Sequence, residues 1–222
     1  MKRYSILGVS LFDHAARESI RLTETFLNSG VLNTAVSLTS QMLSQAAQDE
    51  ELKTLLETTD LTFCAEKDIL EAAGIAAAGR VREIENQIYL RLFLRRLAKQ
   101  QDRVYLLGGD TRQAETLLEM LVTEQGGLNI IACRSYEEYD SQPERLMNAI
   151  NETAPRVILS RMDWPADLKL MHEGRRYLNA ELWMALSEKS LSHRSKQTFL
   201  EGIWKKLFQK KVNEYNEEQA VR

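Results

Sequence analysis

The sequence predicts an α/β fold: a Rossmann-like, mainly parallel sheet flanked by helices, with a helical appendage at the C-terminus. Short β-branched and aliphatic runs alternate with longer amphipathic segments, the pattern of right-handed strand–helix–strand crossovers. The chain has 222 residues, 44% of them hydrophobic and only 3 of them Pro, which favours one sizeable core over two small ones. We expect residues 1–190 to form this domain and 191–222 a basic amphipathic helix and tail.

Strands are expected where short apolar runs end at glycine or at charged residues. In chain order they are Ser5–Leu11, Asn33–Leu38, Leu61–Cys64, Arg103–Leu107, Leu128–Cys133, Arg156–Ser160 and Glu181–Leu186. Between them, apolar residues recur at the spacing of a buried helix face. The expected helices are Arg17–Leu27, Ser40–Thr58, Lys67–Ala78, Glu85–Gln100, Thr111–Glu124, Pro143–Thr153, Ala166–Tyr177 and Lys196–Asn213.

Glycines mark several boundaries of these elements. Gly8, inside the first expected strand, indicates a bulge, and Gly30 is a candidate C-cap for the first helix. Gly126 and Gly127 form the turn before the strand that starts at Leu128. The last residues, 213–222, are expected to fray.

Composition and charge argue against several classes of protein. A net charge of −3 gives no bias toward nucleic acid, so no such partner is expected. Cys64 and Cys133 are far apart, and together with the 3 His residues they show no metal-site spacing, so we expect neither a metal nor a cofactor. Two isolated thiols are typical of a reduced, cytosolic protein.

No targeting or membrane-spanning segment is expected from the sequence. The basic N-terminus is followed by an apolar run that Asp13 and His14 interrupt early, and no cleavage site follows. No stretch of about 18 apolar residues occurs. These features predict a cytoplasmic protein.

The clearest sign of a ligand site is Arg103–Glu115, RVYLLGGDTRQAE, in which a strand feeds a helix through a tight turn. Ligands of open α/β sheets bind at this end of the strands. Gly108 and Gly109 would let a ligand approach bare backbone, and the following helix would offer unpaired N–H groups to a phosphate. The alternative is a purely structural turn in which Asp110 or Thr111 caps the helix.

Positive charge is concentrated near the C-terminus. Between Lys189 and Lys211 there are seven Lys or Arg and a single acid, Glu201. Apolar residues recur there at helical spacing: Phe199, Leu200, Ile203, Trp204, Leu207 and Phe208. Such a helix can bind an anionic bilayer, so residues 199–211 are a candidate for peripheral contact with the inner face of the cell membrane. The alternative is a helix packed on the domain, with its lysines in solvent.

A polar segment, Ser187–Lys196, precedes this helix. It combines hydroxyl groups with Lys189, His193 and Arg194, a composition suited to phosphate. A solvated loop explains the same composition, so both interpretations stay open.

Several segments resemble motifs of the WecB/TagA/CpsF glycosyltransferases, in order and at nearly the family's spacing. The double-glycine segment is similar to RVFLLGGxxxxAE, and Ala149–Leu159, AINETAPRVIL, resembles xINxxxPDILLVGLG. The other matching segments are Ser5–Asp13, Ala35–Leu43, Thr59–Phe63 and Gly127–Ile131. The resemblance covers residues 4 to about 162.

Members of that family have a Rossmann-like fold and transfer an N-acetylhexosamine, typically N-acetylmannosamine, from UDP to a polyprenyl-diphosphate-linked sugar. Their products are cell-envelope polysaccharides. The resemblance therefore implies a UDP-sugar donor and a polyprenyl-linked acceptor. It implies nucleotide binding by Gly108, Gly109 and Asp110, together with Ser37 and Thr39, which stand where the family has Thr and Asn.

The polar site motifs of the family are largely changed in this chain. The catalytic-base aspartate falls on Ala65, which cannot accept a proton, and Glu66, one position along, is the candidate substitute base. The arginine of the motif RVxGxD falls on Glu83 unless Arg82 takes its place. Of the motif GxPxQExW, only Pro165 remains.

The C-terminal motifs are also altered. Met184–Ser190 replaces the family's GVGxxFD, while Trp204, Lys206 and Leu207 keep the character of the terminal EWxYRL. Arg194, from the composition of the polar segment, and Lys206, from this resemblance, are candidates for contacts to phosphate or within the C-terminal segment.

Two hypotheses of different classes follow. In the first, the protein is a UDP-sugar glycosyltransferase with an altered site. In the second, it is a non-catalytic relative that acts in binding or assembly, as a homo-oligomer or with an active paralogue. The first predicts a carboxylate beside Gly108, and the second predicts a filled or acidic pocket.

Overall fold

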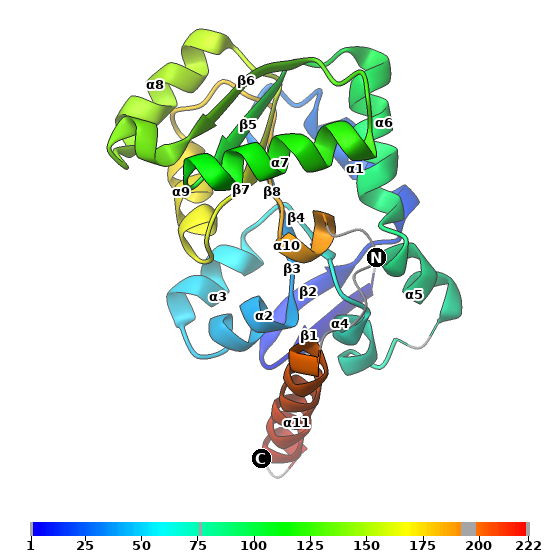
Figure 1. The fold of residues 1–222 in the computed structure, drawn as a ribbon. Coiled ribbons are helices and arrows are strands. Elements are labelled where there is room, and N and C mark those ends of the chain that lie inside the picture. The colour runs from blue at the N-terminus through cyan, green and yellow to red at the C-terminus, as the bar shows by residue number, and fades with distance from the viewer. Residues whose placement is uncertain (1, 76, 192–198, 221–222) are drawn as a thin grey trace.

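The computed structural model describes the backbone of residues 2–75, 77–191 and 199–220, and the side chains of 3–75, 77–190 and 207–219 (Figure 1). Its centre is a six-stranded sheet in which every neighbouring pair is parallel. In spatial order the strands are β4 (Leu61–Cys64), β3 (Asn33–Leu38), β8 (Leu182–Ala185), β7 (Val157–Arg161), β5 (Val104–Gly108) and β6 (Ile130–Ser135). The predicted α/β fold is confirmed.

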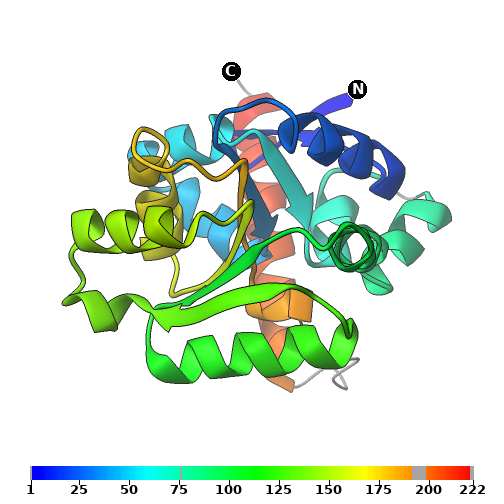
Figure 2. The same ribbon diagram turned by 90° about the horizontal axis from the view of Figure 1, so that it is seen from above.

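Helices cover both faces of this sheet (Figure 2). One face packs against α1 (Ala16–Phe26), α6 (Ile88–Gln100) and α7 (Thr111–Glu124). The other packs against α2 (Ser40–Ala46), α3 (Glu50–Glu57), α8 (Pro143–Thr153) and α9 (Ala166–Gly174). Along β5, Val104 and Leu106 belong to the first core and Tyr105 and Leu107 to the second, so both faces of the strand are buried.

The first expected strand, Ser5–Leu11, is instead an antiparallel hairpin of β1 (Lys2–Ile6) and β2 (Val9–Asp13). Ile6 pairs with Val9, which leaves Leu7 and Gly8 as the turn. Both turn residues have positive φ, at 52° and 80°, as a tight two-residue hairpin requires. Gly8 therefore belongs to a turn and not to a bulge.

Three of the long expected helices are shorter or divided in the structure. The helix expected at Ser40–Thr58 breaks at Asp49, whose carboxylate accepts hydrogen bonds from Glu51 N and Leu52 N and so starts α3. The next, expected at 67–78, is α4 (Lys67–Ala72), after which Gly74 has a φ of 69°. Residues 78–85 form α5 (Ala78–Glu85), and Gln87, with a φ of 50°, separates it from α6.

The C-terminal helix, α11 (Phe199–Ala220), is longer than expected, because residues 213–220 continue it and do not fray. Phe208 and Val212 are buried in the same core as the hairpin, and α11 lies beside α2 and α4. A Cβ on Gly8 would come within 2.6 Å of the Tyr215 hydroxyl, so the helix packs closely on the hairpin turn. In its described part, α11 therefore packs on the domain through its apolar side chains.

Five charged side chains form an ion-pair network near the amino ends of the strands. Asp102 is only 6% exposed. It forms ion pairs with Arg96 of α6 and with Arg156, and its distance to Arg156 is 2.7 Å. Arg96 also pairs with Glu24 of α1, and Arg156 with Glu181, which precedes β8. One buried carboxylate thus connects a covering helix to the start of two sheet strands.

Replacing Asp102 with Asn should reduce the free energy of unfolding by about 3 kcal/mol. The amide keeps the shape of the carboxylate but leaves two partly buried guanidinium groups without their shared charge. Chemical denaturation would measure the change.

The matched control is Asp140→Asn, because Asp140 pairs with Arg145 while its side chain is 68% exposed. That variant should change stability by less than about 0.5 kcal/mol. Equal losses in the two variants would show that burial of the network contributes nothing.

Candidate active-site cleft

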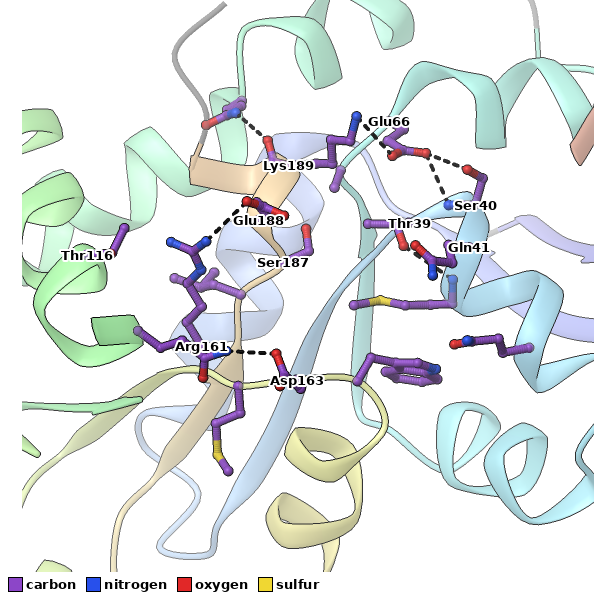
Figure 3. A pocket seen from close by; sticks show the side chains of 18 of the residues that line it. Thr39, Ser40, Gln41, Glu66, Thr116, Arg161, Asp163, Ser187, Glu188 and Lys189 are labelled. Atoms are coloured by element: carbon purple, nitrogen blue, oxygen red, sulfur yellow. Dashed lines mark hydrogen bonds and ion pairs between the residues drawn. The ribbon is translucent and has the colours of Figure 1, made fainter. Parts of the chain in front are cut away.

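A cleft of about 1200 Å³ lies at the carboxyl ends of the parallel strands (Figure 3). Its walls are the segments that follow β3, β4, β5, β7 and β8. This is where ligands of open α/β sheets bind, so the edge of the sheet chosen from the sequence is the one that carries the cleft. The short helix α10 (Glu188–Leu191), which follows β8, contributes Glu188 and Lys189 to it.

The double glycine has a packing role that the sequence did not separate from ligand binding. A Cβ on Gly108 would be 2.3 Å from Ala114 N and 2.7 Å from Asp110 O, so α7 approaches β5 too closely for any side chain there. Gly109 donates its N–H to the Gln113 side chain at 3.0 Å. Asp110 lines the cleft, whereas the two glycines lie behind it.

The amino end of α7 is capped by the protein's own carboxylates. Asp110 Oδ1 accepts from Gln113 N at 2.6 Å, and Glu137 Oε1 accepts from Thr111 N at 2.9 Å and from its hydroxyl at 2.8 Å. The sequence left two interpretations open here, N–H groups free for a phosphate or a helix capped by Asp110 or Thr111. The structure shows the cap at Asp110, and the N–H groups of Thr111 and Gln113 are already satisfied by Glu137 and Asp110.

The two hydroxyl residues at the carboxyl end of β3, Ser37 within the strand and Thr39 just after it, have different environments. Ser37 is fully buried, and its hydroxyl bonds to Ser187 at 2.9 Å and to Ser190 at 2.7 Å. It ties β3 to the segment after β8 and does not line the cleft. Thr39 does line it, and its oxygen also caps α2 by accepting from Met42 N at 3.3 Å.

Glu66 reaches the cleft from the loop after β4. Its Oε2 accepts from Ser40 N at 3.1 Å and from the Ser40 hydroxyl at 2.7 Å, and its Oε1 is 3.9 Å from the Lys189 ammonium (Figure 3). The carboxylate therefore supports the first residue of α2 as well as facing the cleft. Ala65 beside it also lines the cleft but offers only a methyl group.

Two charged residues that the sequence reasoning did not select extend into the cleft from the end of β7. Arg161 is 17% exposed and faces Glu188 at 3.4 Å (Figure 3). Asp163 accepts from the Gln113 amide through Oδ1 at 2.7 Å, and Trp164 lines the wall next to it. The signal was available, because polar residues directly after a buried parallel strand lie at the ligand edge.

The cleft is lined by both acidic and basic side chains, and the acidic ones are more numerous. Among the described residues that line it, six are acidic: Glu66, Asp68, Glu85, Asp110, Asp163 and Glu188. Four are basic: Lys67, Arg112, Arg161 and Lys189. Lys67 pairs with Glu85 at 2.7 Å, while Arg112 is exposed and has no acidic partner in the described part of the chain.

Two of the remaining candidates fall outside the part of the chain whose side chains the structure describes. Arg194 is outside the described residues, and the side chain of Lys206 is also outside them, although its backbone belongs to α11. Glu83 pairs with Arg80 and accepts from Ala16 N at 3.1 Å, away from the cleft. No cluster of His, Cys, Asp or Glu with the arrangement of a metal site occurs among the described residues.

A buried carboxylate beneath the cleft holds the loop that carries Asp163 and Trp164. Asp167 accepts from the Ser160 hydroxyl at 2.7 Å and from Met162 N at 3.3 Å, and it is 5% exposed. Burial raises its pKa from 3.8 to about 6, although both hydrogen bonds oppose the rise. The geometry of the cleft wall thus depends on a carboxyl group that titrates in a mildly acidic range.

The fold and the cleft define an α/β protein with a candidate ligand site at the carboxyl ends of a parallel sheet, the place where open α/β sheets bind their ligands. The model of the family described as "Glycosyl transferase WecG/TagA/CpsF family" matches residues 4–188. This match covers most of the chain, so the protein belongs to the WecG/TagA/CpsF glycosyltransferase family. No curated protein matches the chain significantly.

Arg161, the last residue of β7, and Asp163, two residues further on, can be compared with the family motif at the same positions. In the motif xINxxxPDILLVGLG, the two glycines of the last four positions fall on Arg161 and Asp163 of this chain. Where the family pattern has bare backbone, this protein has two side chains that enter the cleft. The cleft of this chain therefore has two side chains that the family motif lacks, and Ala65 stands where the resemblance places the family's aspartate.

Replacing Gly108 with Ala should destabilise the protein by about 2 kcal/mol or more, because β5 and α7 must separate to admit the Cβ. Gly126→Ala is the control, since nothing lies within 4 Å of a Cβ there. It should stay within about 1 kcal/mol of the wild type. Thermal unfolding compares the two, and a harmless Gly108→Ala variant would refute the close-packing explanation.

Asp167 should make the protein less stable as pH rises from 4 to 7. Its folded pKa, about 6, is above the unfolded value of 3.8, so the native state holds the proton more tightly. The resulting stabilisation is complete below the unfolded pKa and is lost as pH rises through the folded one. The rise in the pKa of Asp167 corresponds to about 3 kcal/mol in the free energy of unfolding.

Asp167→Asn should remove this slope, because an amide does not titrate. Denaturation series at several pH values would give the difference between wild type and variant, which cancels the contribution of other carboxylates. An unchanged difference from pH 4 to 7 would mean that Asp167 is already ionised in the folded protein.

Proposed function

We propose that the cleft binds a UDP-sugar and that the protein transfers the sugar to a polyprenyl-diphosphate-linked acceptor with a site that differs from the family pattern. The observation that carries the proposal is the placement of cations and carboxylates around one cleft at the ligand edge of a sheet in a glycosyltransferase family. The volume, about 1200 Å³, is ample for a nucleotide and a sugar.

Arg161, Lys189 and Arg112 would hold the diphosphate. Two of these cations face acids of the cleft, Glu188 and Glu66. The Glu188 side chain is 84% exposed, so its contact with Arg161 is weak and a phosphate can displace it without desolvating the carboxylate. Arg112, at the start of α7, needs no such exchange among the described residues.

Two carboxylates could take the proton of an incoming hydroxyl. Glu66, the substitute predicted from the sequence, already accepts two hydrogen bonds from Ser40 and faces Lys189. Its two carboxylate oxygens are therefore already engaged, one with Ser40 and one with Lys189. Asp163 has one described partner, Gln113, and an exposed side chain, so its second oxygen is available. We therefore favour Asp163 as the base.

In the proposed reaction the acceptor hydroxyl oxygen forms a bond to the anomeric carbon of the donor sugar. The bond from that carbon to the β-phosphate oxygen breaks, and its electron pair leaves with UDP. The hydroxyl proton passes to the Asp163 carboxylate. The charge that develops on UDP is stabilised by Arg161 and Lys189.

The acceptor lipid would be presented at a membrane surface by residues 199–211. In the described part of this segment Phe208 is buried against the domain and Leu207 is 48% exposed. No helix in the described part of the chain is long and apolar enough to cross a bilayer.

A second function, ligand or partner binding without catalysis, is favoured by the acidic balance of the cleft. Acids outnumber bases there, Asp110 and Glu137 cap the helix that would meet a phosphate, and Ala65 stands at the position of the base. A protein retained for assembly, as a homo-oligomer or with an active paralogue, would need none of the lost groups. The two proposals differ in whether UDP binds.

Calorimetric titration with UDP and then with UDP-N-acetylhexosamines separates them. Micromolar binding is expected for the transferase, and absence of binding at the highest usable concentration would leave the non-catalytic function. If UDP binds, Asp163→Asn should lower the transfer rate about 100-fold or more while leaving UDP affinity within a fewfold of wild type.

Glu66→Gln is the competing variant, and Asp140→Asn, which alters an exposed acid outside the cleft, is the control. UDP release in the presence of a polyprenyl-diphosphate-linked sugar measures the rates. Loss of transfer in Glu66→Gln, with Asp163→Asn fully active, would assign the proton to Glu66.

A further inference from the structure

Gln113, in the first turn of α7, lies between the double-glycine turn and the segment that follows β7. Its side-chain amide makes two hydrogen bonds in different directions. Oε1 accepts from Gly109 N at 3.0 Å, and Nε2 donates to Asp163 Oδ1 at 2.7 Å (Figure 3). One side chain thus connects two of the segments that form the cleft.

The partners of this amide determine which way round it lies. A backbone N–H can only donate, so the atom that faces Gly109 must be the amide oxygen. An ionised carboxylate can only accept, so the atom that faces Asp163 must be the amide nitrogen. The backbone of Gln113 is held as well, because its N–H donates to Asp110 Oδ1 at 2.6 Å. Asp163 therefore meets a donor that is held at both ends.

The second glycine of the turn leaves room for this amide. A Cβ on Gly109 would lie 2.5 Å from Gln113 Oε1, while the next nearest atoms are 3.6 Å away. The φ of Gly109 is not in the left-handed region, so its backbone conformation does not itself require glycine. The two glycines thus have separate roles, because Gly108 lets α7 approach β5 and Gly109 admits the side chain of Gln113.

The side chain of Asp163 depends on this hydrogen bond for its orientation. Asp163 is exposed and lies two residues beyond the end of β7, and its one side-chain hydrogen bond in the described part of the chain is to Gln113. With Oδ1 engaged, Oδ2 is the oxygen that remains for a ligand. A reacting group that is misplaced by about 1 Å can lose about 100-fold in rate, so its orientation matters for proton transfer.

We propose that Gln113 is a positioning residue, which holds the Asp163 carboxylate in the orientation from which Oδ2 meets a ligand in the cleft. The effect of Gln113 on sugar transfer rests on the proposed function, in which Asp163 takes the proton of the acceptor. Its effect on the orientation of Asp163 is independent of that function.

Gln113→Met removes both hydrogen bonds of the amide and keeps an uncharged side chain of similar length. At saturating donor the transfer rate should fall about tenfold, because the lost bond is one to a charged group. UDP affinity should stay within about threefold of wild type, since only an interaction with the reacting group is lost. Equal losses of rate and affinity would show general damage to the cleft and would overturn the proposal.

Gln48→Met is the matched control, because it makes the same change at an exposed site outside the cleft. It should leave both the rate and the UDP affinity unchanged. Gly109→Ala perturbs the same contact by a different route, since the new methyl group displaces the Gln113 amide. Its transfer rate should fall to a similar extent, and a fully active Gly109→Ala variant would contradict the role given to this glycine.

A double-mutant cycle shows whether Gln113 acts through Asp163. In the Asp163→Asn background, Gln113→Met should lower the remaining rate by less than about twofold, because the oriented carboxylate is already absent. A loss in that background as large as in the wild type would mean that Gln113 acts independently of Asp163, and the proposal would fail.

Crystal structures of the wild type and of Gln113→Met test the orientation of Asp163 without UDP. We expect the Asp163 side chain to leave its wild-type rotamer in the variant while the other walls of the cleft stay in place. An unchanged Asp163 side chain overturns the proposal even if sugar transfer is observed. Absence of transfer in the wild type overturns the proposed function alone, and the two structures then decide the role of Gln113.

Discussion

All six strands of the sheet run in one direction, and the rest of the molecule depends on this constraint. Carboxyl ends of parallel strands meet at one edge, so the segments that follow β3, β4, β5, β7 and β8 all contribute to the same cleft. The amino ends of the strands lie at the opposite end of the sheet and have a structural role. There Asp102 forms ion pairs with Arg96 and Arg156. Chemistry and stability are thus divided between the two ends of the strands.

The lining of the cleft differs from the motifs that the chain resembles. Ala65 stands where the resemblance places an aspartate, and Arg161 and Asp163 stand where it places glycines. Arg161 faces Glu188 and Lys189 faces Glu66, so an anionic ligand that binds either of these cations must exchange with an acid of the cleft. Such a site favours a ligand that offers several contacts at once over a simple anion.

The fold was predictable from the sequence because strand and helix periodicity reflect burial, which the parallel sheet imposes on both faces. Two helix breaks were not predicted, because each depends on a single residue. The Asp49 side chain caps the start of α3, and Gln87 has a left-handed backbone conformation before α6. The cleft's edge was predictable from Gly108, but its lining was not. Residue spacing does not encode which side chains pair. It therefore could not show whether the Ser37 hydroxyl faces a ligand or bonds to Ser190, or whether Asp110 binds a ligand or caps α7.

The order of the strands also has a consequence for how the molecule is made. Among the described strands, β8 comes last in the chain, lies between β3 and β7, and alone connects the two halves of the sheet. As the chain leaves the ribosome, the β3–β4 pair and the β5–β6–β7 group can form separately, but each has an open edge until residues 182–185 arrive. The cleft spans that seam, so it forms only once β8 has joined the two halves.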